Sequence, residues 1–187
     1  AGIGIGIGST NYYSGVLSVA AELRGAVGLE LAAGNTVYEV NITNTTGEAG
    51  NSMTAFNGAG VTEGSTAVAD FNLDGNLDVA TVNDNAITIW DAQTLATIGS
   101  VNIATSAPYD NSSLFVGDVD GDCKPEFGLV RSLLLTIYEI DDGMNITTKW
   151  NTNTTDGSGF TGITMFDFNG DGMQELCYRD ETLLRIL

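Results

Sequence analysis

Short apolar runs recur along the chain in sets that repeat about every 48 residues. The first run of each set covers residues 16–21, 67–71, 114–119 and 163–168, and the second covers residues 29–33, 77–81, 125–129 and 174–178. A third run covers residues 36–40, 87–90, 135–140 and 183–187, and a weaker fourth run is clearest at 97–103. The runs are rich in β-branched and aromatic residues and are bounded by Gly, Asn and Asp, which predicts strands.

Four strands in each period predict an all-β protein built from β-propeller-type blades. Each blade would contain four antiparallel strands, and the chain would hold about four repeats of about 48 residues. Helical periodicity is almost absent. Residues 20–31, rich in Ala, Glu, Leu and Arg, could form a helix by composition alone. Their place in the repeat instead predicts the end of one strand and the start of the next.

The N-terminal residues 1–14 are predicted to be separate from the repeats at 15–187. Ile and Gly alternate strictly over residues 1–8, so Ile3, Ile5 and Ile7 would share one face of a strand. A Gly-rich strand is weak without a neighbour, and the last repeat reaches only its third strand. We therefore expect residues 3–7 to pair with a sheet edge, either closing a blade in the same chain or being donated to a neighbouring chain.

Three nine-residue segments between the first and second runs share an acidic pattern. They are residues 70–78, 118–126 and 167–175, and they start 48 and 49 residues apart. Each has an oxygen-bearing side chain at positions 1, 3, 5 and 9. A fourth segment, 22–30, keeps the acids at positions 1 and 9 but has Arg24 and Ala26 at positions 3 and 5. We interpret it as a degenerate copy that binds no ion.

The repeated segments resemble the FG-GAP/VCBS repeat family, which includes the propellers of integrin α-subunits and many bacterial and archaeal surface proteins. The resemblance covers roughly residues 15–187 and implies an extracellular calcium-binding propeller whose acidic loops hold the ions. The chain departs from the family pattern at the degenerate segment and at Cys123, which replaces the usual glycine. Propellers of this family commonly have seven blades, which is more than the repeats counted in this chain.

The chemistry of the loops independently favours calcium, which takes six to eight oxygen ligands in a flexible shell. Positions 1, 3, 5 and 9 would offer side chains and position 7 its backbone carbonyl, so about three ions are expected. The candidate ligands are Asp70, Asn72, Asp74, Asn76, Asp78, Asp118, Asp120, Asp122, Lys124, Glu126, Asp167, Asn169, Asp171, Met173 and Glu175. An EF-hand is disfavoured because position 12 is Thr81, Leu129 or Tyr178 rather than Glu.

Composition narrows the function classes. The chain has 24 acidic and six basic residues, a net charge of −18, which disfavours nucleic acid and anionic lipid as partners. High acidity by itself could equally be an adaptation to solubility or salt. His is absent, so Ser–His and Cys–His catalysis and most transition-metal sites are excluded within the chain. No apolar stretch is long enough to predict a membrane span.

These observations predict a non-catalytic, calcium-stabilised module at the cell surface, for adhesion or as a fibre subunit. Its partners would be a carbohydrate or protein surface ligand, together with self-association or further blades. Glycosylation sequons occur at Asn41, Asn44, Asn111, Asn145 and Asn153. The alternative is part of a calcium-dependent polysaccharide-active enzyme similar to a propeller lyase. That alternative needs catalytic groups outside the loops, for which the candidates are Asp110, Asp156 and Arg131.

The two cysteines leave two interpretations open. Cys123 and Cys177 could form a disulfide, as is common in secreted proteins. Alternatively, Cys177 occupies a buried position for small residues, where the other repeats have Ala32, Ala80 and Gly128, and Cys123 is a thiol on the solvent side.

Overall fold

The computed structural model describes residues 18–83, 85–103, 114–155, 163–180 and 183–187. Every regular element in this part of the chain is a strand, so the all-β prediction is confirmed and residues 20–31 form no helix. The described residues contain no helix that could cross a membrane. The strands are β1 (Ser18–Ala21), β2 (Glu30–Ala33), β3 (Thr36–Asn41), β4 (Ser52–Asn57), β5 (Ser65–Ala69), β6 (Asp78–Val82), β7 (Ala86–Asp91), β8 (Thr97–Asn102), β9 (Phe115–Gly117), β10 (Glu126–Arg131), β11 (Leu134–Ile140), β12 (Ile146–Asn153), β13 (Ile163–Phe166), β14 (Glu175–Arg179) and β15 (Leu184–Ile186).

The strands form sheets in which neighbours along the chain are also neighbours in space. Strands β1 to β4, β5 to β8 and β9 to β12 each make a four-stranded antiparallel sheet, and β13 to β15 make a three-stranded one. We call these sheets one to four. The repeat register is therefore borne out, because the first, second and third apolar runs of each repeat become the first, second and third strands of a sheet. The weak run at 97–103 is β8.

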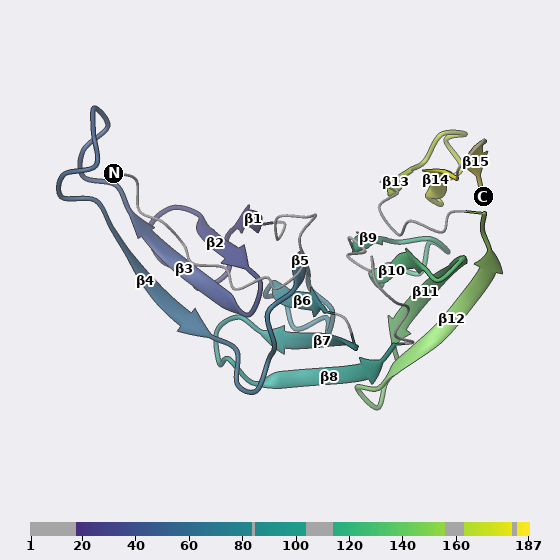
Figure 1. Cartoon of the computed structure of the whole chain (residues 1–187), viewed down its shortest axis with the longest axis horizontal. Coiled ribbons are helices and arrows are strands. Elements are labelled where there is room, and N and C mark those ends of the chain that lie inside the picture. Colours follow the sequence, from purple (N-terminus) through teal and green to yellow (C-terminus); the bar gives the residue numbers. More distant parts are fainter. Residues whose placement is uncertain (1–17, 84, 104–113, 156–162, 181–182) are drawn as a thin grey trace.

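The sheets lie side by side in an arc (Figure 1). The first strands β1, β5, β9 and β13 are on the inside of the arc, where β1 contacts β5, β5 contacts β9 and β9 contacts β13. The long fourth strands β4, β8 and β12 form the outside. Sheets one and four are at opposite ends of the arc, so the described residues do not make a closed ring.

The hydrophobic core consists of layers between adjacent sheets. Between sheets two and three, Phe127 packs edge-on against Phe71 at 5.3 Å between ring centroids and stacks on Tyr138 at 5.9 Å. Between sheets one and two, the layer contains Val37 and the fully buried Trp90. Side chains alternate across each strand, so one face of a sheet packs on the preceding sheet and the other face on the following sheet.

Sheet four has a face with no neighbour among the described residues. The strand register makes Ile89, Ile137 and Ile186 equivalent, because each lies opposite the third residue of the second strand. Ile89 is fully buried and Ile137 is 4% exposed, whereas Ile186 is 58% exposed. Phe71 and Phe168 are also equivalent, as the second residues of their loops, and Phe168 is exposed. The positions that each preceding sheet buries against the next are therefore open on sheet four.

Several sequence predictions fall on residues outside the described ranges. They include the N-terminal segment 1–14 with its alternating Ile and Gly, the sequon at Asn111, and the catalytic candidates Asp110 and Asp156. The pairing of residues 3–7 with a sheet edge therefore stays a prediction.

Candidate metal-binding loops

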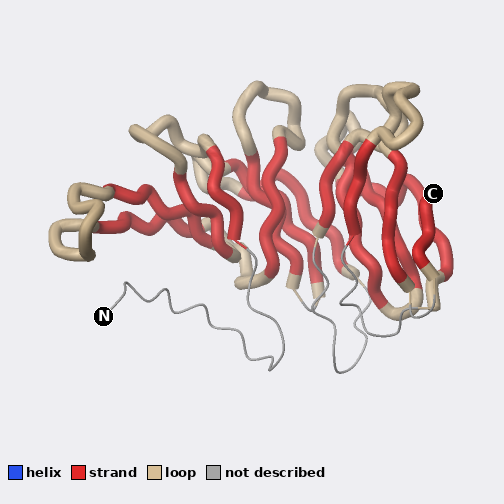
Figure 2. Tube along the Cα trace, turned by 90° about the horizontal axis from the view of Figure 1, so that it is seen from above, coloured by secondary structure: helices blue, strands red, loops and turns tan. Residues whose placement is uncertain are grey.

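All four nine-residue loops occupy the same place in their sheets. Each one connects the inner strand to the second strand, as between β5 and β6 or between β9 and β10. Successive strands alternate in direction, and each of the first three sheets has four strands, so the inner strands of all sheets run the same way. The loops that follow the inner strands therefore lie at the same edge of the arc. Figure 2 shows loops, drawn in tan, projecting beyond the strand ends along this edge of the arc.

The backbone of the three acidic loops turns twice through the left-handed region. Positions 4 and 6 have positive φ angles in each of them, at Leu73 and Gly75, Gly121 and Cys123, and Gly170 and Gly172. Glycine adopts this conformation without the steric cost that a Cβ atom imposes. The degenerate loop keeps Gly25 at position 4 but has its second left-handed residue at Gly28, one position late. Its backbone path thus differs from that of the acidic loops.

Side-chain oxygens at the alternate positions bind the loop's own backbone. In loop 167–175, Asp167 accepts hydrogen bonds from the N–H groups of Gly170 and Gly172 at 2.6 and 2.9 Å. Asn169 accepts from Asp171 N at 2.8 Å, and Asp171 accepts from Met173 N at 2.9 Å. These bonds tie the side chains at positions 1, 3 and 5 to the loop backbone, and the N–H of Gly172 is the main cause that holds the pKa of Asp167 below its ordinary value.

The carboxylate at position 9 closes every loop, including the degenerate one, by accepting the N–H of the residue at position 2. The four bonds are Leu23 N to Glu30 at 2.7 Å, Phe71 N to Asp78 at 3.1 Å, Val119 N to Glu126 at 2.8 Å and Phe168 N to Glu175 at 2.8 Å. This position therefore has a structural role in addition to any role as a ligand. The sequence carried a signal for it, since the degenerate loop keeps the acid at position 9 after losing the oxygens at positions 3 and 5.

Loop 70–78 contains a buried carboxylate oxygen without a hydrogen-bond partner. Asp78 is 1% exposed, and its Oδ1 atom has no hydrogen-bond partner, while Oδ2 accepts from Phe71 N. Burial raises the pKa of Asp78 to about 7, against the lowering effect of the Phe71 and Asn72 N–H groups, and Asp74 and Asp91 raise it further. An ionised carboxylate in this place needs a positive partner. The donor set of the loop therefore fits a hard cation such as calcium.

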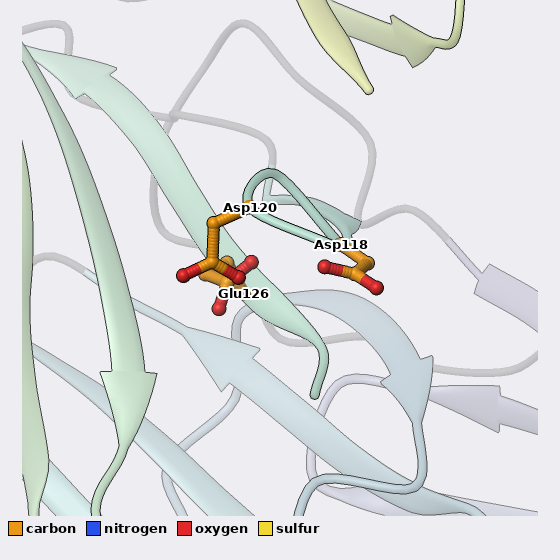
Figure 3. A group of neighbouring side chains, drawn as sticks. All are labelled: Asp118, Asp120 and Glu126. Atoms are coloured by element: carbon orange, nitrogen blue, oxygen red, sulfur yellow. The ribbon is translucent and has the colours of Figure 1, made fainter. Parts of the chain in front are cut away.

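Loop 118–126 brings its carboxylates closest together. Within the described residues, Asp118, Asp120 and Glu126 each place an oxygen within 4.8 Å of the other two (Figure 3). A residue that the sequence patterns did not indicate also enters this group. The Nζ atom of Lys149 lies 2.7 Å from Asp120 Oδ2 and 2.9 Å from Glu126 Oε1. It also lies 2.9 Å from Glu139 Oε2, so one ammonium group joins three carboxylates.

Lys149 is firmly charged in this arrangement. Desolvation lowers its pKa, but the hydrogen bonds to Asp120, Glu139 and Glu126 outweigh that effect and raise the pKa above its ordinary value. Burial raises the pKa of Glu126, and Val119 N–H and Lys149 oppose the rise. In loop 167–175 the corresponding oxygen of Glu175 instead accepts the side-chain amide of Asn169 at 2.7 Å. The three acidic loops therefore differ in what satisfies the carboxylate at position 9.

Arg24 holds the degenerate loop against sheet two. Its guanidinium donates to the carbonyls of Ala92 and Gln93, lies 3.6 Å from Glu39 and covers the ring of Phe56 at 4.0 Å from the centroid. Glu30 accepts three backbone N–H groups, which together lower its pKa even though burial raises it. This loop thus satisfies its acid with its own backbone. The absence of an ion here remains a prediction.

The remaining candidate residues have other surroundings. Lys124 at position 7 reaches Asp142 at 3.4 Å, and Met173 at the same position is exposed. Arg131, proposed as a catalytic group, is buried and donates to the carbonyl of Asn83 at 3.1 Å. Of the described sequons, Asn41, Asn145 and Asn153 are exposed and Asn44 is half-buried.

Cys123 and Cys177 are both free, so the structure contains no disulfide between them. The second interpretation of the cysteines agrees with this, with one correction. Cys123 is exposed, as expected for a thiol on the solvent side, but Cys177 is only half-buried because it lies on the sheet that lacks a following neighbour.

The chain shares its fold with two much larger proteins. It superposes on a chain of the Photorhabdus luminescens Tc holotoxin pore with a TM-score of 0.52 and 16% identity, covering 90% of this chain and 9% of that one. It superposes on an Agrocybe aegerita lectin, described as recognising non-reducing terminal N-acetylglucosamine, with a TM-score of 0.55 and 12% identity, covering 91% of this chain and 48% of the lectin. At these identities the likeness concerns the fold alone.

Sequence comparison finds a family match in the middle of the chain. No curated protein sequence matches this chain. The family model of the FG-GAP-like repeat matches residues 70–129, a segment that starts at the first acidic loop and extends beyond the second. Residues 70–129 therefore match the FG-GAP-like repeat, as the acidic loops indicated.

Proposed function

We propose that this chain is a calcium-stabilised, non-catalytic surface module that acts outside the cell as a binding or structural unit. The observation that carries the proposal is the buried Oδ1 atom of Asp78, the last residue of loop 70–78, because this atom lacks a hydrogen-bond partner. Leaving a buried carboxylate oxygen unpaired is costly, and a bound cation removes that cost. The FG-GAP-like repeat at residues 70–129 supports the same function.

Three loops would hold the ions. In loop 70–78, Asp70, Asn72, Asp74 and Asp78 would offer side chains and Asn76 its backbone carbonyl, and the other two acidic loops would use the equivalent residues. Bound calcium supplies positive charge to carboxylates that otherwise repel one another, so three ions would reduce the net charge from −18 to −12. Calcium sites of extracellular modules are typically filled at about 10⁻⁴–10⁻³ M calcium, which agrees with the proposed location.

Calorimetric titration of the full chain with calcium is the direct test. We expect uptake that saturates at three ions per chain, one for each acidic loop, with magnesium binding more weakly because its octahedral geometry tolerates less flexibility. The Asp70→Asn variant should lose one ion, since it removes a charge from loop 70–78 alone. A titration without calcium uptake by the wild-type chain would contradict the proposal.

We propose a carbohydrate as the ligand of this module. A cavity of about 230 Å³ lies between sheets three and four, and it presents an apolar surface with a few polar groups, as small-molecule sites do. Its lining residues are Val119, Ile137, Lys149, Trp150, Gln174, Leu176 and Leu187. Trp150 is partly exposed, so its ring could stack against a sugar. Glycan-array binding that is lost in Trp150→Ala would support this ligand, whereas binding unchanged by the substitution would contradict the site.

We also propose that the chain associates with itself through the open face of sheet four. The equivalent faces of sheets two and three each bury their apolar residues against the next sheet. A second copy, supplying a sheet of the same kind, would continue this series. Leu184 and Ile186 are 72% and 58% exposed, which is unfavourable for large aliphatic side chains in water.

Light scattering over a range of concentrations tests this association. The wild-type chain is expected to form dimers or longer assemblies, and Ile186→Asp should shift it to monomers. Ile42→Asp is the matched control, because Ile42 is equally exposed at 58% but lies in the loop between β3 and β4, away from sheet four. A wild-type chain that stays monomeric at the highest concentration, or equal effects of both substitutions, would contradict the proposal.

A further inference from the structure

The three acidic loops use the same sequence pattern but do not offer the same environment to a cation. Asp78 leaves one buried oxygen without a partner, whereas the equivalent oxygen of Glu126 accepts a hydrogen bond from Lys149 at 2.9 Å. The Glu126 side chain is completely buried, so this ammonium is its counter-ion inside the protein. A charged group thus already occupies part of loop 118–126.

The residue type at one equivalent strand position explains why loop 118–126 has a lysine partner and loop 70–78 does not. In sheet three, the register between β11 and β12 shifts by one residue. Lys149, between Thr148 and Trp150 on β12, therefore has no partner residue opposite it on β11. Sheet two has the same shift at the equivalent place, between β7 and β8, and there the unpaired residue is Ile98. Ile98 packs on the hydrophobic core between sheets two and three. At the position equivalent to Lys149, sheet two therefore has the apolar Ile98, which cannot pair with Asp78 as Lys149 pairs with Glu126.

We propose that Lys149 is a built-in counter-ion of loop 118–126 and competes with calcium for the oxygens of Asp120 and Glu126. This inference rests on the proposed calcium binding and adds a regulation to it: loop 118–126 is the last of the three to fill, and loop 70–78 fills before it. Calcium must displace an ammonium group that makes three short ion pairs, including one with Glu139 outside the loop. The same ammonium keeps this loop closed when calcium is scarce.

Substitution of Lys149 distinguishes the effect of its ammonium group from the effect of calcium. In Lys149→Met, calcium has no competitor, and its affinity for loop 118–126 should rise about tenfold or more in calorimetric titration. The apo protein should lose stability, because Glu126 is left buried without its counter-ion, and calcium should restore that stability. Lys149→Arg keeps the positive charge and should keep the low affinity. Adding Asp118→Asn to Lys149→Met should abolish the gained affinity, which assigns it to this loop.

Arg179→Met is the matched control. It makes the same change in net charge, but Arg179 is exposed at the end of β14 and lies outside the acidic loops. Its effect on the calcium affinity of loop 118–126 should therefore be small. If Lys149→Met and Arg179→Met have equal effects, the long-range charge of the surface is responsible and the proposal is wrong.

An independent measurement uses the wild-type chain and does not depend on the folding of a variant. Lys124 and Lys149 are the two lysines of the sequence, so acetylation at limiting reagent can be followed at each one by mass spectrometry. Saturating calcium should release Lys149 and raise its acetylation several-fold, with Lys124 as the internal reference. Calcium uptake with no change at Lys149 would overturn the competition alone, whereas no calcium uptake at all would overturn the proposed function.

Discussion

Removal of calcium by a chelator is expected to lower the melting temperature of this chain by roughly 5–11 °C for each loop that loses its ion. An ion present at about 100 times its dissociation constant stabilises the folded state by about 2.7 kcal/mol per site. For a chain of this size, each kcal/mol corresponds to roughly 2–4 °C. The physical reason is the repulsion among the carboxylates of each loop once the ion is gone, together with the unpaired oxygen of Asp78.

Two aspartates provide a matched pair for this measurement. Asp74→Ala removes an oxygen at position 5 of loop 70–78, so it should abolish the share of calcium stabilisation that this loop provides. Asp142→Ala removes the same charge from a fully exposed side chain whose ion pair with Lys124 is 3.4 Å long, and exposed pairs contribute little. Thermal melts with calcium and with chelator will distinguish the two variants. Identical melting temperatures in the two conditions would show that the ions do not stabilise the fold.

Replacing Phe71 with alanine is expected to destabilise the chain by about 3–5 kcal/mol, the usual cost of removing a buried aromatic side chain. Phe71 is 4% exposed and packs edge-on against Phe127 between sheets two and three. Urea denaturation of Phe71→Ala measures this cost as a shift of the unfolding midpoint.

Phe168 occupies the equivalent position in its own loop and serves as the control. It is 53% exposed and touches Phe166 at 5.4 Å between ring centroids, so Phe168→Ala should cost less than about 1 kcal/mol in the monomer. If the two substitutions cost the same in a monomeric sample, neighbouring sheets do not account for the stability of these positions. A cost at Phe168 that grows with protein concentration would instead indicate burial in an assembly.

The sequence determined the repeat and the chemistry of the loops. Strand alternation and the spacing of the acidic segments are local properties, so the apolar run at 97–103 and the loop at 70–78 could be located without any tertiary contact. The same pattern identified the degenerate loop, because Arg24 stands where an oxygen is expected. Its backbone confirms a different path, with the second left-handed residue one position late at Gly28.

Only the tertiary structure decided how each acid at position 9 is satisfied. Lys149 lies 23 residues beyond Glu126, and a register shift in another strand directs it to that carboxylate. Such a shift depends on pairing between strands and leaves no local pattern. The free cysteines and the open face of sheet four have the same cause, since both depend on which sheet packs beside which. The sequence thus specified the oxygen-bearing residues of each loop, while packing between sheets determined the charge that surrounds them.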